Sequence, residues 1–143
     1  MLGRLLSRLR RTESPTKRLG RRGEQAAASF LRREGYRILG RNVRVKIGEA
    51  DIVCEAPDRR TIVIVEVKTR LRGAGKSAKS ESMSPEFSVH HRKRKKLAAI
   101  ARVLIRANGW ADRPVRIDVI AVDWPASGEK PTLRHHIGIQ VRS

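Results

Sequence analysis

The fold is decided by the segment at residues 62–68, which reads IVIVEVK. Its unbroken run of β-branched residues is typical of a strand buried in a sheet. Side chains alternate between the two faces of a strand, so every second residue shares a face. One face then carries Ile62, Ile64, Glu66 and Lys68. That face changes from apolar to ionisable where the strand leaves the core.

Hydrophobic periodicity predicts two helices and four more strands around this segment. The helices are expected at residues 17–34 and 89–108, each closed by a glycine. The strands are expected at residues 36–45, 49–55, 62–69, 115–122 and 133–141. The order α-β-β-β-α-β-β predicts an α/β fold with a mixed sheet of about five strands flanked by helices.

The domain organisation predicted from the sequence is one domain at residues 16–143 behind a basic tail at residues 1–15. The tail is expected to be flexible, although its leucines and arginines would also suit an amphipathic helix or a transit segment. Residues 71–88 are rich in Gly, Ser and Lys and poor in apolar residues, so a mobile loop is expected there.

The chain is strongly basic, with 33 Lys and Arg against 14 Asp and Glu and a net charge of +19 in 143 residues. A compact domain with this charge repels itself unless something anionic shares its surface, so a polyanion is the expected partner. Aromatic residues make up only 3% of the chain. This scarcity argues against base-stacking platforms and favours recognition of the phosphate backbone.

Cysteine content and hydropathy indicate the cellular compartment that we expect. Cys54 is the only cysteine and lies in an apolar stretch, so it is expected to be a buried hydrophobe with no disulfide partner. No segment approaches the roughly 20 apolar residues of a membrane span. We therefore expect a cytoplasmic protein with no membrane partner.

The predicted hairpin of residues 49–55 and 62–69 brings two carboxylates together. A four-residue turn at residues 57–60 places Asp51 opposite Glu66 on the same face, with Cβ atoms about 5 Å apart. Carboxylates at this distance repel each other unless a cation lies between them. In the same register Lys68 faces Glu49 and supplies part of the positive charge.

Such a site suits a hard divalent cation, Mg²⁺ or Mn²⁺, and phosphodiester hydrolysis. The ion would polarise a phosphoryl oxygen and acidify bound water, while Lys68 orients that water or stabilises the transition state. The sequence contains no G-x-S-x-G elbow and no Cys–His arrangement that would indicate a nucleophilic side chain instead.

These same residues carry a family resemblance. The segments GEADIV at residues 48–53 and VEVKTR at residues 65–70 resemble the divided PD-(D/E)xK signature of restriction-endonuclease-like nucleases. More closely, the chain resembles the YraN-like family of uncharacterised bacterial proteins, themselves similar to archaeal Holliday-junction resolvases. The resemblance covers residues 20–122, including Arg41-Asn42 and Arg116-Ile117-Asp118-Val119.

The resemblance implies a restriction-endonuclease-like fold with Asp51, Glu66 and the Val67 carbonyl as metal ligands and Lys68 as the catalytic lysine. It also implies that Glu24, carried by the first helix, joins the metal site. Its helical spacing with the apolar stripe points Glu24 toward the sheet, although an acid near a helix start also complements the helix dipole. Resolvases of this type act as dimers on branched DNA, which makes a homodimer a candidate assembly, although the sequence shows no unmistakable interface.

A basic run opens the second predicted helix: Arg92, Lys93, Arg94, Lys95 and Lys96. Cations at a helix N-terminus oppose its dipole by about 0.3–1 kcal/mol each, and phosphate would relieve this cost. The run, together with Arg70, is therefore the candidate nucleic-acid-binding surface, with a solvated basic face as the alternative. The sequence thus predicts a metal-dependent nuclease for structured or branched DNA, or else a non-catalytic DNA- or RNA-binding protein.

Overall fold

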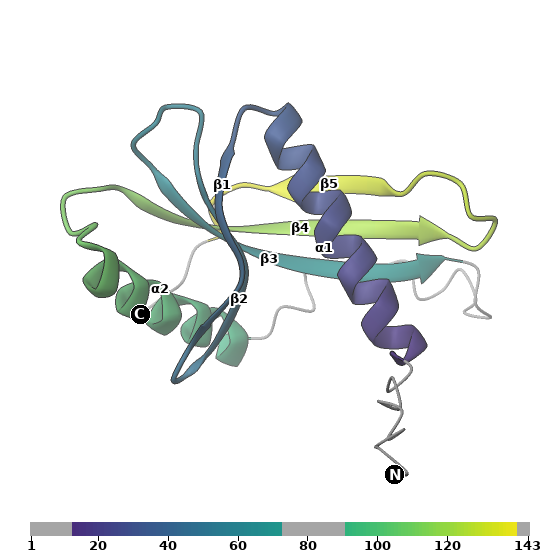
Figure 1. The fold of residues 1–143 in the computed structure, drawn as a ribbon, viewed down its shortest axis with the longest axis horizontal. Coiled ribbons are helices and arrows are strands. Elements are labelled where there is room, and N and C mark those ends of the chain that lie inside the picture. Colours follow the sequence, from purple (N-terminus) through teal and green to yellow (C-terminus); the bar gives the residue numbers. More distant parts are fainter. Residues whose placement is uncertain (1–12, 73–90, 140–143) are drawn as a thin grey trace, which may run out of the picture.

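The computed structural model describes residues 13–72 and 91–139. Its elements follow the predicted order (Figure 1): α1 (Pro15–Arg33), β1 (Arg37–Val45), β2 (Gly48–Glu55), β3 (Ile62–Arg72), α2 (His91–Asn108), β4 (Val115–Pro125) and β5 (Thr132–His136). The structure is the mixed α/β, restriction-endonuclease-like architecture that the sequence predicts.

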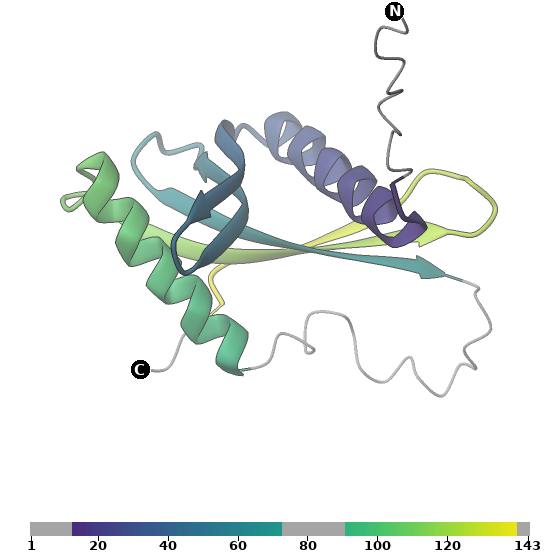
Figure 2. The same cartoon turned by 60° about the horizontal axis from the view of Figure 1, so that its bottom comes forward.

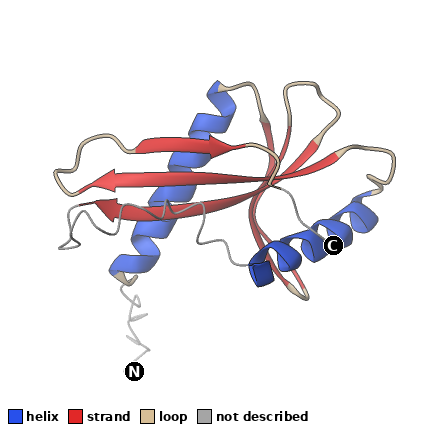
Figure 3. Ribbon diagram, turned by 180° about the vertical axis from the view of Figure 1, so that it is seen from behind, coloured by secondary structure: helices blue, strands red, loops and turns tan. Residues whose placement is uncertain are grey.

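The five strands form one sheet in the order β1-β2-β3-β4-β5. Neighbouring strands are antiparallel except β3 and β4, which run parallel and are connected through α2. The two helices cover opposite faces of the sheet (Figure 2). From behind, α2 is seen to lie across the β1–β2 end of the sheet, away from β5 (Figure 3).

Helix α1 begins two residues before the predicted start because Ser14 caps it. The Ser14 hydroxyl accepts a hydrogen bond from the Lys17 N–H at 3.3 Å, and Pro15 occupies the first turn, where no N–H is needed. Gly35, at φ +88°, follows the helix in the left-handed conformation that glycine tolerates. The predicted boundary of the tail at residue 15 therefore falls inside the helix, and residues 1–12 lie outside the described residues.

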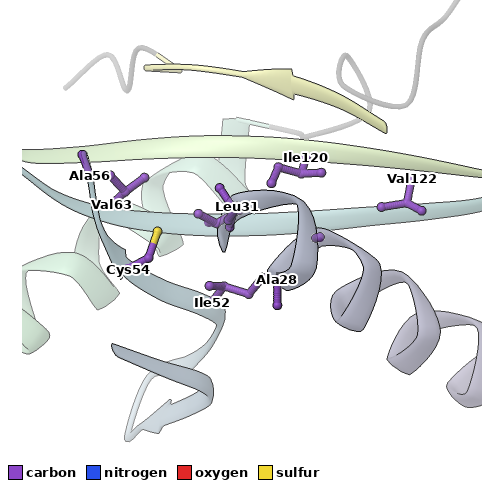
Figure 4. Close-up of a cluster of buried hydrophobic side chains, with 10 residues drawn as sticks. Ala28, Leu31, Ile52, Cys54, Ala56, Val63, Ile120 and Val122 are labelled. Atoms are coloured by element: carbon purple, nitrogen blue, oxygen red, sulfur yellow. The ribbon is translucent and has the colours of Figure 1, made fainter. Parts of the chain in front are cut away.

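The core on the α1 face is built from small and β-branched side chains (Figure 4). Ala28 and Leu31 of α1 are fully buried against Val63 and Val65 of β3. Cys54 is buried in the same cluster, as predicted, and burial raises the pKa of its thiol to about 12. Full burial of a valine or leucine side chain stabilises the fold by roughly 1.5–3 kcal/mol.

The core on the α2 face uses the alternate residues of β3. Ile62 and Ile64 pack there against Leu97, Ile100 and other apolar residues of α2. Both faces of β3 are therefore buried, which explains why residues 62–65 are all apolar. Neither helix of the described ranges is long and apolar enough to cross a membrane.

Several strand ends differ from the prediction. Strand β3 continues to Arg72, so the predicted mobile loop loses its first two residues, and its remainder lies outside the described residues. Strand β5 ends at His136 rather than at residue 141. Its early end has a physical cause: Gly138, at φ +67°, redirects the chain so that its N–H donates to the Asp118 carboxylate at 2.9 Å.

Candidate metal and nucleic-acid site

The predicted register between β2 and β3 is found. The Ala56 N–H donates to the Thr61 carbonyl at 2.9 Å, and Ile52 lies opposite Val65. Continued by one residue, this register sets Asp51 against Glu66. Both carboxylates line one cavity of about 240 Å³ on the α2 face, so they do converge.

Asp51 has few groups to compensate its charge. Its Oδ2 accepts a hydrogen bond from the Val67 N–H at 2.8 Å. Burial and the neighbouring charge of Glu66 outweigh that bond and raise the pKa of Asp51 to about 7. A carboxyl group with a raised pKa marks a place where the fold brings carboxylates together in a partly buried setting.

Glu66 is buried, with 5% of its surface exposed, and two lysines meet its carboxylate. Lys68 Nζ lies 3.5 Å from Glu66 Oε1, and Lys93 Nζ contacts the same oxygen. Burial and the charge of Lys93 lower the pKa of Lys68. Burial alone would lower the pKa of Lys93 too, but its contact with Glu66 raises it.

The predicted pairing of Lys68 with Glu49 is wrong. The β2–β3 ladder ends at Ile52 and Val65, so the register no longer governs residues beyond Asp51. Glu49 instead accepts a hydrogen bond from Arg44 Nε at 3.0 Å across the β1–β2 hairpin.

Glu24 lies at the edge of the site. Its side chain is half-buried, and burial raises the pKa of its carboxyl group. With the Asn42 amide nitrogen turned toward the carboxylates, Asn42 donates to Glu24 Oε2 at 3.0 Å and to Glu49 Oε1 at 3.1 Å. Asn42 has a left-handed backbone, at φ +48°, and this link was not predicted from the sequence. Within the two described ranges, no three His, Cys, Asp or Glu side chains are grouped closely enough to hold a metal ion.

The basic run of α2 divides between the cavity and solvent. Lys93 and Lys96 line the cavity that holds the two carboxylates, and Lys95 is exposed to solvent. Arg94 is half-buried. The side chain of Arg92 lies outside the described residues. Lys93 and Lys96 therefore belong to the carboxylate site, whereas Lys95 lies outside it.

Arg70 occupies a different part of the surface. Its Nε lies 3.4 Å from Oδ1 of the buried Asp123 in β4. Arg72 and Arg134 approach the same carboxylate, at 3.6 Å and 3.0 Å. Asp123 therefore anchors Arg70, and the structure does not bring Arg70 into the cavity of Asp51 and Glu66.

Comparison with known proteins identifies the family. The family described as "Uncharacterised protein family UPF0102" matches residues 23–122. UPF0102 proteins of Pelobacter propionicus and Moorella thermoacetica are 41% and 42% identical over 120 and 106 residues, covering 78% and 74% of this chain and 80% and 81% of theirs. A UPF0102 protein of Geobacter sulfurreducens is 40% identical over 117 residues, covering 82% of this chain and 84% of its own.

Similarity to solved structures is weaker. The structure of Pyrococcus furiosus SfsA in complex with Ca²⁺ is similar over 87% of this chain and 65% of its own, with 17% identity and a TM-score of 0.37. A similarity at this level supports no argument about function. The family match and the relatives do decide the family: the chain belongs to UPF0102, the YraN family that its motifs resemble.

Proposed function

We propose that this protein is a Mg²⁺- or Mn²⁺-dependent endonuclease that hydrolyses phosphodiesters in DNA. One observation carries the proposal: Asp51 and Glu66 line the same cavity, and burial together with the Glu66 charge raises the pKa of Asp51. Two carboxylates that repel each other in a half-buried pocket favour a cation of high charge between them.

The residues fit a hard divalent ion. Mg²⁺ is commonly bound through one or two carboxylates, with water and substrate phosphates in its other positions. Asp51 and Glu66 supply two carboxylates in one cavity, and the Val67 carbonyl is the third ligand that the resemblance implies. Glu24 stays outside this set but is linked to the site through Asn42.

The chain's own groups have distinct roles around such an ion, which when bound polarises a phosphoryl oxygen and acidifies water. Asp51 and Glu66 would hold the ion. Lys68 Nζ lies 3.5 Å from Glu66 Oε1, and burial together with the charge of Lys93 lowers its pKa. Lys68 therefore orients water or stabilises the charge that develops on the phosphate. Lys96 lines the same cavity and extends the positive surface for the neighbouring phosphates.

We propose structured or branched DNA as the substrate class. The support is the similarity of the motifs to those of Holliday-junction resolvases, which also makes a homodimer the assembly to test. The net charge of +19 supports binding to any nucleic acid and does not select among substrates.

A non-catalytic DNA- or RNA-binding protein is the second candidate, and one observation favours it. Lys68 and Lys93 already neutralise Glu66, so the site is electrostatically compensated on one side without a metal ion. A protein that only binds nucleic acid would need nothing more from these residues.

The test is a titration of Mg²⁺ and Mn²⁺ with the full chain on labelled duplexes, flaps and four-way junctions. We expect nicking that depends on the metal ion and is abolished by Asp51→Asn while salt-sensitive binding remains. Asp112→Asn makes the same chemical change at an exposed turn and should cut like the wild type. Binding without cutting on every substrate would overturn the nuclease in favour of the second candidate, and cutting that survives Asp51→Asn would place the chemistry elsewhere.

A further inference from the structure

A second cavity, of about 600 Å³, lies along the outer edge of β1. It is bounded by the last turn of α1, by β1 and by the turn between β2 and β3. Four of its nine lining residues are arginines and none is acidic: Arg32, Arg37, Arg41 and Arg59. Four guanidinium groups gathered around one hollow repel each other, which an anion in that hollow would relieve.

These four arginines make few interactions that would stabilise the fold. All four are exposed. Of these four arginines, only Arg37 lies within ion-pair distance of a carboxylate among the described residues, at 3.5 Å from Glu55. Arg113 binds that carboxylate more closely, at 2.6 Å. Packing and ion pairs within the fold therefore do not account for the cluster.

The backbone around the cavity is irregular in ways that present these side chains. The pairing of β1 with β2 shifts between Ile38 and Gly40, so Leu39 forms a bulge in the edge strand. Arg59 is held in the turn at φ +61°, a conformation that non-glycine residues seldom adopt. Arg37 and Arg41 are four residues apart on β1, or about 13 Å along an extended strand.

That spacing suits a chain of phosphates better than a single ion. One strand of a duplex carries a phosphate for about every 3.4 Å of helix axis. Arg37 and Arg41 are therefore far enough apart to contact different phosphates of one strand.

One end of the arginine cavity is linked to the carboxylate site through neighbouring residues. Arg41 is paired with Ile52, the residue after Asp51 on β2, and its charge acts on the Glu24 carboxyl group. Asn42, the next residue, holds Glu24 and Glu49. Arg41 is therefore the arginine of this cavity that the structure links to the surroundings of the proposed metal site.

The two cavities also use different cations. Lys93 and Lys96 line the carboxylate cavity, whereas every cation that lines the second cavity is arginine. The guanidinium group binds phosphate with two parallel hydrogen bonds and stays charged at any working pH, so it suits positioning rather than proton transfer.

We propose that this arginine cavity holds the phosphodiester backbone of DNA beside the site of cleavage, as a second contact that positions the strand. This inference rests on the proposed function, because it takes the bound strand to be the substrate of the nuclease. The contact is to phosphates, so it carries no sequence preference.

The test is a salt series of binding to a labelled DNA duplex, with the full chain in EDTA so that no cutting is involved. Each phosphate contact contributes about 0.9 to the slope of log affinity against log salt. The double variant Arg32→Gln/Arg41→Gln should therefore bind with a slope shallower by about 1.8 and lose roughly tenfold or more in affinity at low salt. Thermal unfolding of each variant checks that these exposed substitutions leave the fold intact.

The matched control is Arg33→Gln/Arg106→Gln, which removes the same charge from exposed positions outside both cavities. The inference would be overturned if Arg32→Gln/Arg41→Gln had the same salt slope as the control. It would also be overturned if the variant lost affinity for RNA duplexes only. Cleavage is measured separately with Mn²⁺. If the wild type does not cut but the arginine-cavity variant still has a shallower salt slope, the nuclease alone is refuted. If the wild type cuts and the salt slope of the variant is unchanged, the arginine contact alone is refuted.

Discussion

Asp118 in β4 and Asp51 in β2 are two aspartates of the same sheet that the protein treats in opposite ways. Asp118 is 0% exposed, and polar groups contact both oxygens of its carboxylate. Arg116 donates two hydrogen bonds to it, at 2.8 Å and 3.0 Å, and the Gly138 N–H donates a third at 2.9 Å. His135 Nε2 lies 2.8 Å from its Oδ2.

The pKa values of the two carboxyl groups diverge accordingly. Burial alone would raise the pKa of Asp118, but the contacts with His135, Arg116 and the Gly138 N–H outweigh it and hold the pKa below its ordinary value. For Asp51, burial and the charge of Glu66 outweigh the hydrogen bond from the Val67 N–H and raise the pKa to about 7.

The comparison separates a structural carboxylate from a functional one. Buried polar groups in stable folds are hydrogen-bonded, and strongly perturbed titratable groups gather at sites that act on something. Asp118 is held by hydrogen bonds from within the chain and ties β4 to β5, whereas Asp51 accepts one described hydrogen bond and keeps a raised pKa, as the proposed metal site would require. The predictions below test this difference.

The largest effect is expected from Asp118→Ala. The substitution leaves the half-buried Arg116 without a counter-ion and the Gly138 N–H without an acceptor, so the free energy of unfolding should fall by about 3 kcal/mol. Urea unfolding near pH 7 measures it. Asp112→Ala, at an exposed position, should change stability by less than about 0.5 kcal/mol. A loss at Asp118 no larger than at Asp112 would remove the structural role.

Asp51→Asn should stabilise the protein at high pH. A folded-state pKa of about 7 against the ordinary 3.8 means that the folded protein binds the proton more tightly. The wild type therefore loses stability as pH rises between these two values. The asparagine oxygen can still accept from the Val67 N–H. We expect a gain on the order of 2 kcal/mol at pH 8, discounted because the group is partly exposed, and almost none at pH 4.

Urea unfolding at pH 4, 6 and 8 measures this gain. Asp118 contributes in the opposite sense: its lowered pKa gives stability that is present above its unfolded pKa and is lost as pH falls. A difference between Asp51→Asn and the wild type that is the same at all three pH values would mean that the pKa of Asp51 is not raised, and a loss of stability that grows with pH would mean that Asp51 is compensated like Asp118.

Much of this difference lies beyond what the sequence shows. The alternation in residues 62–68 and the turn at residues 57–60 are local, so they predicted both buried faces of β3 and the register that opposes Asp51 to Glu66. The contacts of Asp118 come from His135 and Gly138, far along the chain, and no local pattern reveals that these residues meet it.

The partners of the two lysines at the site show the same limit. Pairing Lys68 with Glu49 extends a ladder that ends at Ile52 and Val65. The contact of Lys93 with Glu66 depends on the docking of α2 on the sheet, which cannot be deduced from helical periodicity. Register is encoded locally, whereas the partners of a charged side chain depend on how distant elements pack.

Gly23→Ala extends the comparison to the helix that carries Glu24. A Cβ atom at Gly23 would overlap the side chain of Thr69 on β3, so α1 must move away from the sheet. Overpacking of this kind costs about 1–3 kcal/mol. We expect a loss of about 1.5 kcal/mol in urea unfolding, together with weaker metal-dependent cutting if Glu24 belongs with Asp51.

Gly20→Ala is the matched control on the same helix. No atom lies within 4 Å of a Cβ at Gly20, so alanine should stabilise the helix by roughly 0.5–1 kcal/mol and leave cutting unchanged. Equal stability changes at Gly20 and Gly23 would show that α1 is not pressed against β3, and the position of Glu24 would lose its support.

The smallest effect concerns the cation that the fold already supplies. Lys93 contacts the Glu66 oxygen that a divalent ion would bind, so metal binding has to displace its ammonium group or tolerate its charge. Lys93→Met should therefore raise the affinity for Mn²⁺ about fivefold, or roughly 1 kcal/mol, since the lysine is partly exposed and its pairing is screened. Isothermal titration of Mn²⁺ without nucleic acid measures it.

Lys95→Met serves as the control because Lys95 is exposed on the same helix and does not line the carboxylate cavity. It removes the same charge at a greater distance from Glu66, where salt screens most of its effect. If Lys93→Met binds Mn²⁺ no better than Lys95→Met, then lysine and metal do not compete for Glu66. Asp51 and Glu66 would then resemble Asp118, a carboxylate group completed by the chain itself, and the metal ion would have no place between them.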